Sequence, residues 1–137
     1  MQGLLGSKLL ELPVRLHGIA LGRPLDLLLD GEGRRVVGIY VVCGDDAERF
    51  LPLAAAVFGA DEIGVETALA VIDDADFYRK RGRTLAELKG SGVDESGVGV
   101  GVLEDVVVAA DGTVTHLVLD GGRRLPLGDE TRLAAAA

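Results

Sequence analysis

The sequence predicts a mainly β protein made of two small antiparallel β-barrels, packed with pseudo-twofold symmetry and joined by a short helical connector. Three observations support this prediction. The chain of 137 residues repeats itself internally, each copy reads as short apolar segments separated by Gly and Asp turns, and no long helical pattern separates these segments. Strands at this spacing without long helices favour a small antiparallel barrel.

The internal repeat is the first of these observations. An offset of 79 superimposes residues 9–29 on residues 88–108 without a gap, and five positions are then identical. They are Leu9/Leu88, Val14/Val93, Gly18/Gly97, Gly22/Gly101 and Asp26/Asp105. After small gaps the match resumes, with 36–41 against 114–119, the Leu-Pro-Leu of Pro52 against that of Pro126, and 66–70 against 130–134. Chance rarely places so many matches in the same order.

Turn residues divide the first copy into strands. Residues 14–16 form a short strand before Gly18, and residues 21–29 form a longer one in which Pro24 indicates an edge or a bulge, since proline donates no hydrogen bond. Residues 30–33 read as a hairpin turn that needs positive φ, and the β-branched run 36–42 follows it. After a turn at 44–46, residues 49–53 return and 67–72 close the copy. The second copy has turns at 110–112 and 120–122.

A connector separates the two copies. Acidic residues at 73–76 precede basic residues at 79–83, which suits the dipole of a short helix that ends at Gly82. The spacing of Thr84 and Glu87 predicts a capping box and a further turn of helix. We therefore predict one barrel-like repeat over 1–76, the connector over 77–89 and the second repeat over 90–137. A half of this size is marginal alone, so we expect an intimate pair, or a homodimer.

Composition limits the classes of function. The net charge is −8 and the pI about 4.7, which disfavours binding to a phosphate backbone, so nucleic acid is not the expected partner. The uncharged stretches are too short for a membrane helix, and no leader of basic then apolar residues opens the chain. The single cysteine, Cys43, has no partner for a disulfide. We expect a cytoplasmic protein without membrane insertion.

The pattern of Gly22-x-x-x-Asp26 in an aliphatic strand, an Asp/Gly turn, the run 36–41 and then the Leu-Pro-Leu around Pro52 resembles the PRC-barrel family. The second copy repeats it with Gly101-x-x-x-Asp105 and Pro126. The family includes the cytoplasmic domain of the photosynthetic reaction centre H subunit and the C-terminal domain of a ribosome maturation factor. The resemblance implies a compact barrel that serves as an interaction module, while neither of those two specific roles carries over to this chain.

Few residues are candidates for catalysis or for binding a ligand or a metal ion. Asp26 and Asp105, acids inside apolar strands, are expected to accept hydrogen bonds from neighbouring backbone or to pair with an arginine such as Arg34 or Arg123, and the alternative is a carboxylate for a ligand. His17 and His116 are not at equivalent positions and read as surface or turn residues. Cys43 ends an apolar run and reads as an inert buried thiol. Residues 97–101 lack the Lys and helix of a phosphate loop and read as turn or bulge glycines. No metal or cofactor is predicted.

The basic end of the connector is the sharpest local feature. Cationic and aromatic side chains lie together there and can contact an acidic partner, or can form the solvated end of a helix balanced by the preceding acids. The predicted partner contact consists of Phe77, Tyr78, Arg79, Lys80, Arg81 and Arg83.

These observations lead to one functional prediction and two alternatives. We expect a non-enzymatic cytoplasmic module of PRC-barrel type that binds another protein, because no titratable groups stand at a recognisable catalytic spacing. The alternatives are a ribosome-associated or RNA-processing factor, and a protein that binds a small molecule between the two halves with Asp26 or Asp105 as polar anchors.

Overall fold

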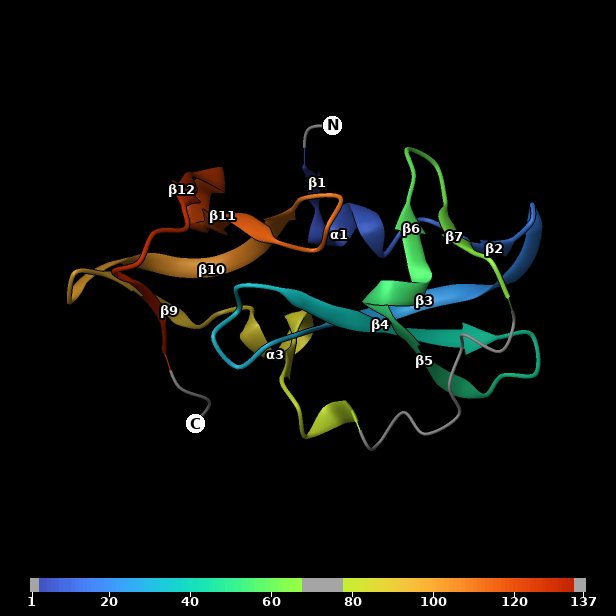
Figure 1. Cartoon of the computed structure of the whole chain (residues 1–137). Coiled ribbons are helices and arrows are strands. Elements are labelled where there is room, and N and C mark those ends of the chain that lie inside the picture. Colours follow the sequence, from blue (N-terminus) through green and yellow to red (C-terminus); the bar gives the residue numbers. More distant parts are fainter. Residues whose placement is uncertain (1–2, 68–77, 135–137) are drawn as a thin grey trace.

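The computed structural model of the chain describes residues 3–67 and 78–134. It is mainly β, with two curled sheets that lie side by side and short helices near the middle (Figure 1). The helices with both ends among the described residues are α1 (Gly6–Leu9), α3 (Leu85–Leu88) and the 3-10 turns η1 (Leu53–Ala55) and η3 (Asp120–Gly122). The strands are β1 (Leu4–Leu5), β2 (Val14–Leu16), β3 (Ile19–Leu29), β4 (Val36–Cys43), β5 (Glu48–Pro52), β6 (Ala56–Phe58), β7 (Ile63–Val65), β8 (Arg83–Thr84), β9 (Gly92–Glu95), β10 (Val98–Val108), β11 (Val114–Leu119), β12 (Arg124–Pro126) and β13 (Thr131–Leu133).

The first sheet has the order β5-β4-β3-β2-β7-β6, and β8 also pairs with β3. Its long strand β3 pairs with β4 along one edge, and with β2 and then β8 along the other. The register shifts between Pro24 and Asp26, so the bulge expected at this proline is present. On the other edge, β2 pairs with β3 only as far as Gly22 and β8 pairs only from Leu28, so neither ladder reaches Pro24 on that side.

The second sheet has the order β12-β11-β10-β9-β13, and β1 also pairs with β10. The strand β10 is as long as β3, and its register shifts between Leu103 and Asp105. Its turn to β11 meets the turn from β3 to β4, where Arg35 and Thr113 form an isolated antiparallel bridge. Two hydrogen bonds flank that bridge: Val36 N donates to Gly112 O (2.8 Å) and Val114 N donates to Arg34 O (2.9 Å).

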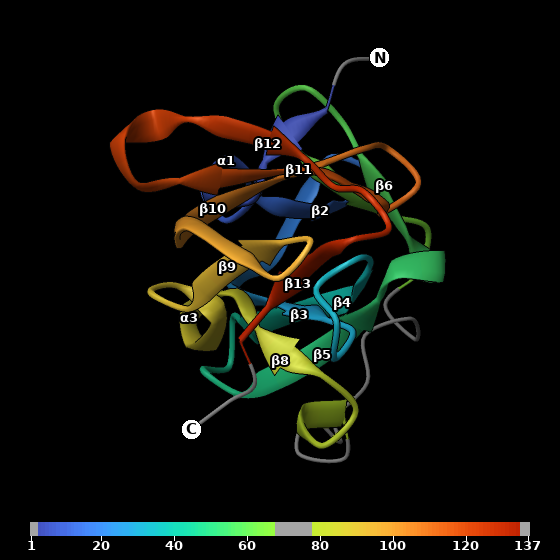
Figure 2. The ribbon, with the colours of Figure 1, turned by 90° about the vertical axis from the view of Figure 1, so that its left-hand side faces the viewer.

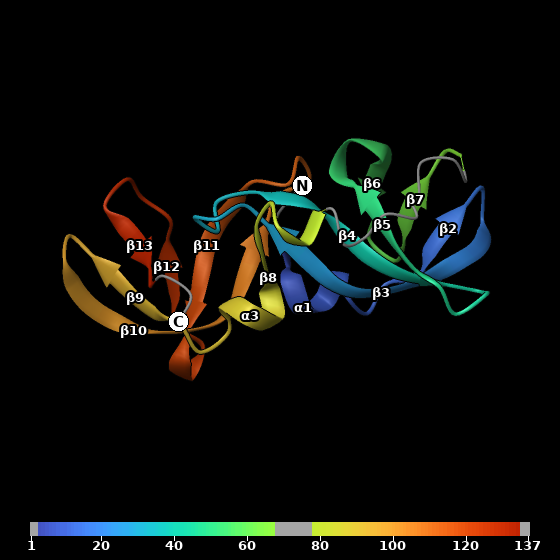
Figure 3. The same ribbon diagram turned by 90° about the horizontal axis from the view of Figure 1, so that it is seen from below.

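Two segments cross from one sheet to the other. The first arm is β1 with α1, and it lies on β10 with Leu4 opposite Val108. The second arm is β8 with α3, and it lies on β3 with Arg83 opposite Leu29. Figure 3 shows α1 and α3 next to each other between the sheets. A Cβ at Gly6 would come within 3.0 Å of Leu85 Cδ2, so the glycine of one helix makes room for the leucine of the other.

Aliphatic side chains from both sheets form one core. Its buried members include Leu27 and Ile39 from the first sheet, Leu103 and Leu117 from the second, and Leu85 from the second arm. A smaller cluster of Leu28, Tyr40 and Phe50 covers the other face of the first sheet. Each face of strand β4 contacts one of these clusters, which explains why the strand is apolar on both faces.

The sequence prediction holds for several elements and misses others. The capping box at Thr84 and Glu87 is confirmed, since Thr84 Oγ1 accepts from Glu87 N (3.1 Å) and the Glu87 carboxylate accepts from Thr84 N (3.2 Å). Strands β6 and β7 were not predicted, and β7 runs parallel to β2. The predicted closing strand at 67–72 lies mostly outside the described residues.

Candidate functional site

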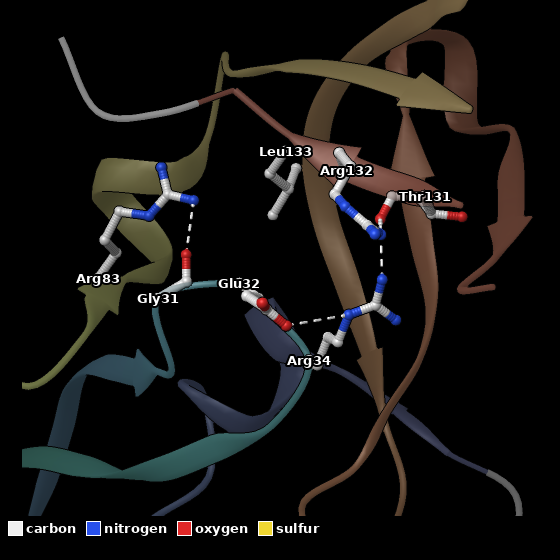
Figure 4. Close-up of a pocket in the computed structure, with 7 residues that line it drawn as sticks. All are labelled: Gly31, Glu32, Arg34, Arg83, Thr131, Arg132 and Leu133. Atoms are coloured by element: carbon white, nitrogen blue, oxygen red, sulfur yellow. Dashed lines mark hydrogen bonds and ion pairs between the residues drawn. The ribbon is translucent and has the colours of Figure 1, made fainter. Parts of the chain in front are cut away.

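A cleft of about 370 Å³ lies between the β3–β4 turn of the first sheet and strand β13 of the second (Figure 4). Figure 2 shows β13 passing beside that turn and beside β8. We call it the arginine cleft, and its lining residues are Gly31, Glu32, Arg34, Arg83, Thr131, Arg132 and Leu133. These residues come from three segments that are far apart in the sequence.

The β3–β4 turn places Arg34 at the floor of the cleft. Asp30 organises the turn, because its carboxylate accepts from Arg34 N (2.8 Å) and its carbonyl accepts from Gly33 N (3.0 Å). Gly33 has φ +73°, and a Cβ there would lie 2.6 Å from Leu133 Cδ1, so the turn requires glycine and packs directly against β13. The Arg34 side chain then crosses to the second sheet, where Nη2 donates to Thr131 O (2.9 Å) and to Gly128 O (3.0 Å).

Two further arginines line the walls. Arg83 in β8 spans the cleft mouth, donating to Gly31 O (3.0 Å) and to Ala134 O (2.8 Å). Arg132 in β13 donates to Thr131 O (2.9 Å) and to Asp129 O. Figure 4 shows Glu32 and Leu133 between Arg83 on one side and Arg34 with Arg132 on the other.

The lining carries a local positive charge in an acidic protein. Three arginines and one glutamate give a formal charge of +2 among the lining residues, whereas the whole chain carries −8. Glu32 approaches Arg34, with 3.4 Å between Oε2 and Nε, and its side chain is 77% exposed. Guanidinium groups stay protonated in proteins and act only as donors. The arrangement can therefore bind an anion through charged N–H donors.

Two residues of the predicted partner contact, Tyr78 and Arg79, pack on the first sheet. The Tyr78 ring stacks on Phe50 (4.1 Å between centroids), and Arg79 lies over the Tyr40 ring (4.6 Å) and pairs with Glu48. Lys80 and Arg81 are exposed, while Arg83 belongs to the arginine cleft. Phe77 and the acids at 73–76 lie outside the described residues.

Asp26 and Asp105 cap the two arms and do not line the arginine cleft. Asp105 accepts from Ser7 N (3.1 Å) and Ser7 Oγ (2.5 Å) at the start of α1, and Asp26 accepts from Ala86 N (3.3 Å) at the start of α3. Each also accepts from the next residue of its own strand. The first N–H groups of a helix have no partner inside it, so a carboxylate there satisfies a donor and complements the helix dipole. This is the contact with neighbouring backbone that the sequence analysis expected; neither acid pairs with Arg34 or Arg123.

The surroundings of the other predicted repeat positions explain why glycine or proline fits there. A Cβ at Gly22 would lie 2.4 Å from Val42 O, and one at Gly101 would lie 2.6 Å from Asp120 Oδ1. Asp120 accepts from Val102 N (3.1 Å), which together with the neighbouring Arg123 holds the pKa of its carboxyl below the usual value. Pro52 and Pro126 end strands β5 and β12, which are the outermost strands of their sheets, where a missing donor costs no ladder bond.

The histidines and the cysteine take no part in the arginine cleft. His17 is exposed in a turn with φ +50°, and its Nε2 lies 3.0 Å from Glu66 O. His116 contacts Thr115 Oγ1, and Cys43 is buried. Within residues 3–67 and 78–134, no group of three or more His, Cys, Asp or Glu side chains is arranged to hold a metal ion. No helix of that same part is long and apolar enough to cross a membrane.

Sequence reasoning missed the arginine cleft. Its lining joins Arg34 to Thr131, which are separated by 97 positions, and neither Arg132 nor Glu32 stands in a recognisable motif. The available signals were the Asp30 turn, which points the next side chains to one side, and the match of 130–134 to the first copy. Neither signal says that the β3–β4 turn faces β13.

Comparison with models of known protein families finds no match to the chain, and a search of curated proteins finds none either.

Proposed function

We propose that the chain is a tandem of two PRC-barrel-type halves that serves as a non-enzymatic interaction module and binds its partner at the arginine cleft. The observation that carries the functional part is the convergence of Arg34, Arg83 and Arg132 from both halves on one cleft. The resemblance in the aliphatic strands and Leu-Pro-Leu segments supports the PRC-barrel part of the proposal.

The pairing of the two arms supports the tandem arrangement. Leu4 lies opposite Val108 and Arg83 lies opposite Leu29, so the partners of one pair stand 79 positions from their counterparts in the other. The caps follow the same offset, since Asp105 binds Ser7 and Asp26 binds Ala86. These contacts are those expected of two copies that exchange their first strand and helix across a pseudo-twofold axis.

The bridge between the β3–β4 and β10–β11 turns supports the same axis. Arg35 and Thr113 are equivalent when 36–41 is aligned with 114–119, and they pair with each other. Two equivalent residues can pair across an antiparallel bridge only where the axis passes between them. Exchange of this kind lets each marginal half complete its core with the other half.

The chemistry of the arginine cleft supports binding over catalysis. Its cations are arginines, which recognise carboxylates and phosphates through paired donors and do not act as acids or bases near neutral pH. Their donors also hold backbone carbonyls of both sheets, so the cleft is built by the same contacts that join the halves. A partner at this place would contact both halves at once.

Affinity purification of the tagged chain from its own cell tests this proposal. Arg132→Glu reverses a charge whose hydrogen bonds reach only the carbonyls of Asp129 and Thr131 in its own segment, so the fold should persist. Arg124→Glu is the matched control, because Arg124 is exposed on β12 of the same sheet and does not line the cleft.

We expect a protein that co-purifies with the wild type and with Arg124→Glu and is lost with Arg132→Glu. Retention of that protein by Arg132→Glu would remove the cleft from the proposal. Recovery of RNA in place of protein, sensitive to nuclease, would favour the ribosome-associated alternative. In the same experiment Lys80→Ala tests the exposed part of the connector, which we expect to be dispensable.

A further inference from the structure

Two guanidinium groups of the arginine cleft converge on one acceptor. Arg34 Nη2 and Arg132 Nη1 both donate to Thr131 O at 2.9 Å, so the two donor nitrogens cannot be farther apart than twice that distance. Thr131 itself is buried, with 2% of its surface exposed. A neutral carbonyl compensates only weakly for two like charges at this separation, and an anion placed there would interact favourably with both.

A carboxylate already stands beside this pair. Glu32 is the one acid among the described residues that line the cleft, and its Oε2 lies 3.4 Å from Arg34 Nε. Because 77% of the Glu32 side chain is exposed, the pair is of the solvent-screened kind that contributes little to stability. Such a contact marks where a carboxylate fits, and an external carboxylate can displace it.

We propose that the arginine cleft is a carboxylate-binding site and that Glu32 is its internal competitor. The cleft volume of about 370 Å³ lies at the small end of the range for ligand sites. It therefore suits a short organic acid or a single acidic side chain, with Leu133 as an apolar wall beside the charged groups. This inference rests on the proposed function, for which it names the chemical group that is recognised.

The test titrates the full chain with three probes while arginine Nε–H signals are followed by NMR: succinate, a short peptide rich in Asp and Glu, and inorganic phosphate. Three variants accompany the wild type. Glu32→Gln removes the competitor and should tighten succinate binding about two- to fivefold, the effect of one exposed charge. Arg132→Gln should weaken it by a similar factor, and Arg124→Gln should leave it unchanged.

Tighter binding by Glu32→Gln is the decisive result, because damage to the fold cannot produce it. Peptide binding stronger than that of succinate would identify a protein as the source of the carboxylate, and the reverse would identify a small organic acid. Phosphate that binds more tightly than succinate would overturn the assignment to a carboxylate. So would succinate and peptide shifts that are absent, or that are unaffected by Glu32→Gln and Arg132→Gln. If carboxylate binding fails in this way, a partner protein lost with Arg132→Glu would still support the proposed function. If carboxylates bind but no protein co-purifies, the proposed function is contradicted and the carboxylate site is not.

Discussion

The two arms of the molecule follow one plan but have unequal caps. Asp105 receives both the N–H and the hydroxyl of Ser7 and is only 9% exposed, whereas Asp26 receives only Ala86 N of its arm, at 3.3 Å, and is partly exposed. The reason lies in the helices. Thr84 and Glu87 provide α3 with a capping box of its own, while the N-cap Leu5 of α1 offers no side-chain hydrogen bond. The two aspartates thus lie in like places, and we expect their neighbours to determine how much stability each contributes.

The largest effects should come from the apolar side of the arms, where the two are alike. Leu9 in α1 and Leu88 in α3 stand 79 positions apart, and both are fully buried. Leu9→Ala and Leu88→Ala should each lower the free energy of unfolding by about 2–5 kcal/mol, because each leaves a cavity in the shared core. Guanidinium chloride unfolding gives both values. A loss below about 1 kcal/mol for one of them would show that the arms do not pack alike.

Removal of the capping aspartates should destabilise the first arm more than the second. Asp105→Ala removes the acceptor of both Ser7 N and Ser7 Oγ in a partly buried place and should cost about 2–3 kcal/mol, whereas Asp26→Ala should cost about 1 kcal/mol. The same unfolding measurement compares them. Equal costs would contradict the inference that α1 depends more strongly on its aspartate than α3 does.

A smaller effect should follow from exchanging the residues that the caps hold. Ser7→Ala gives the first arm the residue of the second and should cost about 1 kcal/mol, since Asp105 loses a hydroxyl donor. Ala86→Ser makes the reverse change and should stabilise the chain by about 0.5 kcal/mol or less, because Asp26 is more exposed. Midpoints of thermal unfolding can resolve both. Midpoint changes of opposite sign for Ser7→Ala and Ala86→Ser would support the claim that the hydroxyl donor strengthens the cap, and changes of the same sign would contradict it.

The smallest effects concern carboxylates in the turns. The Arg49 side chain lowers the pKa of Asp45 in the first half, and the N–H groups of Thr113 and Val102 lower the pKa values of Asp111 and Asp120 in the second. A folded pKa below the unfolded one stabilises the fold above the unfolded pKa, and this stability is lost as the pH falls through the folded value. Asp120→Asn should therefore be less stable than the wild type at neutral pH, and the difference should shrink below about pH 4. A difference independent of pH would exclude this origin.

Local rules explain why much of the fold was predictable. Turn glycines such as Gly18 and Gly97 have positive φ, so their sequence signal is direct, and the bulge at Pro24 follows from the donor that proline lacks. The pairing of β1 with β10 was not predictable, because β3 and β10 are similar partner strands by sequence. The arginine cleft depends on that pairing and on the turn at Asp30, and contacts over 97 positions leave no local pattern.

Cysteine cross-linking tests the central claim, the exchange of the arms, most directly. With Cys43→Ser as background, Leu5→Cys with Val107→Cys places thiols on residues that lie opposite each other in β1 and β10, at a separation that a disulfide spans. Leu5→Cys with Leu28→Cys tests the alternative in which β1 stays on the sheet of its own copy. We predict an intramolecular disulfide in the first variant and none in the second, as read by mass spectrometry of the monomer. A disulfide in the second variant and not in the first would contradict the exchange.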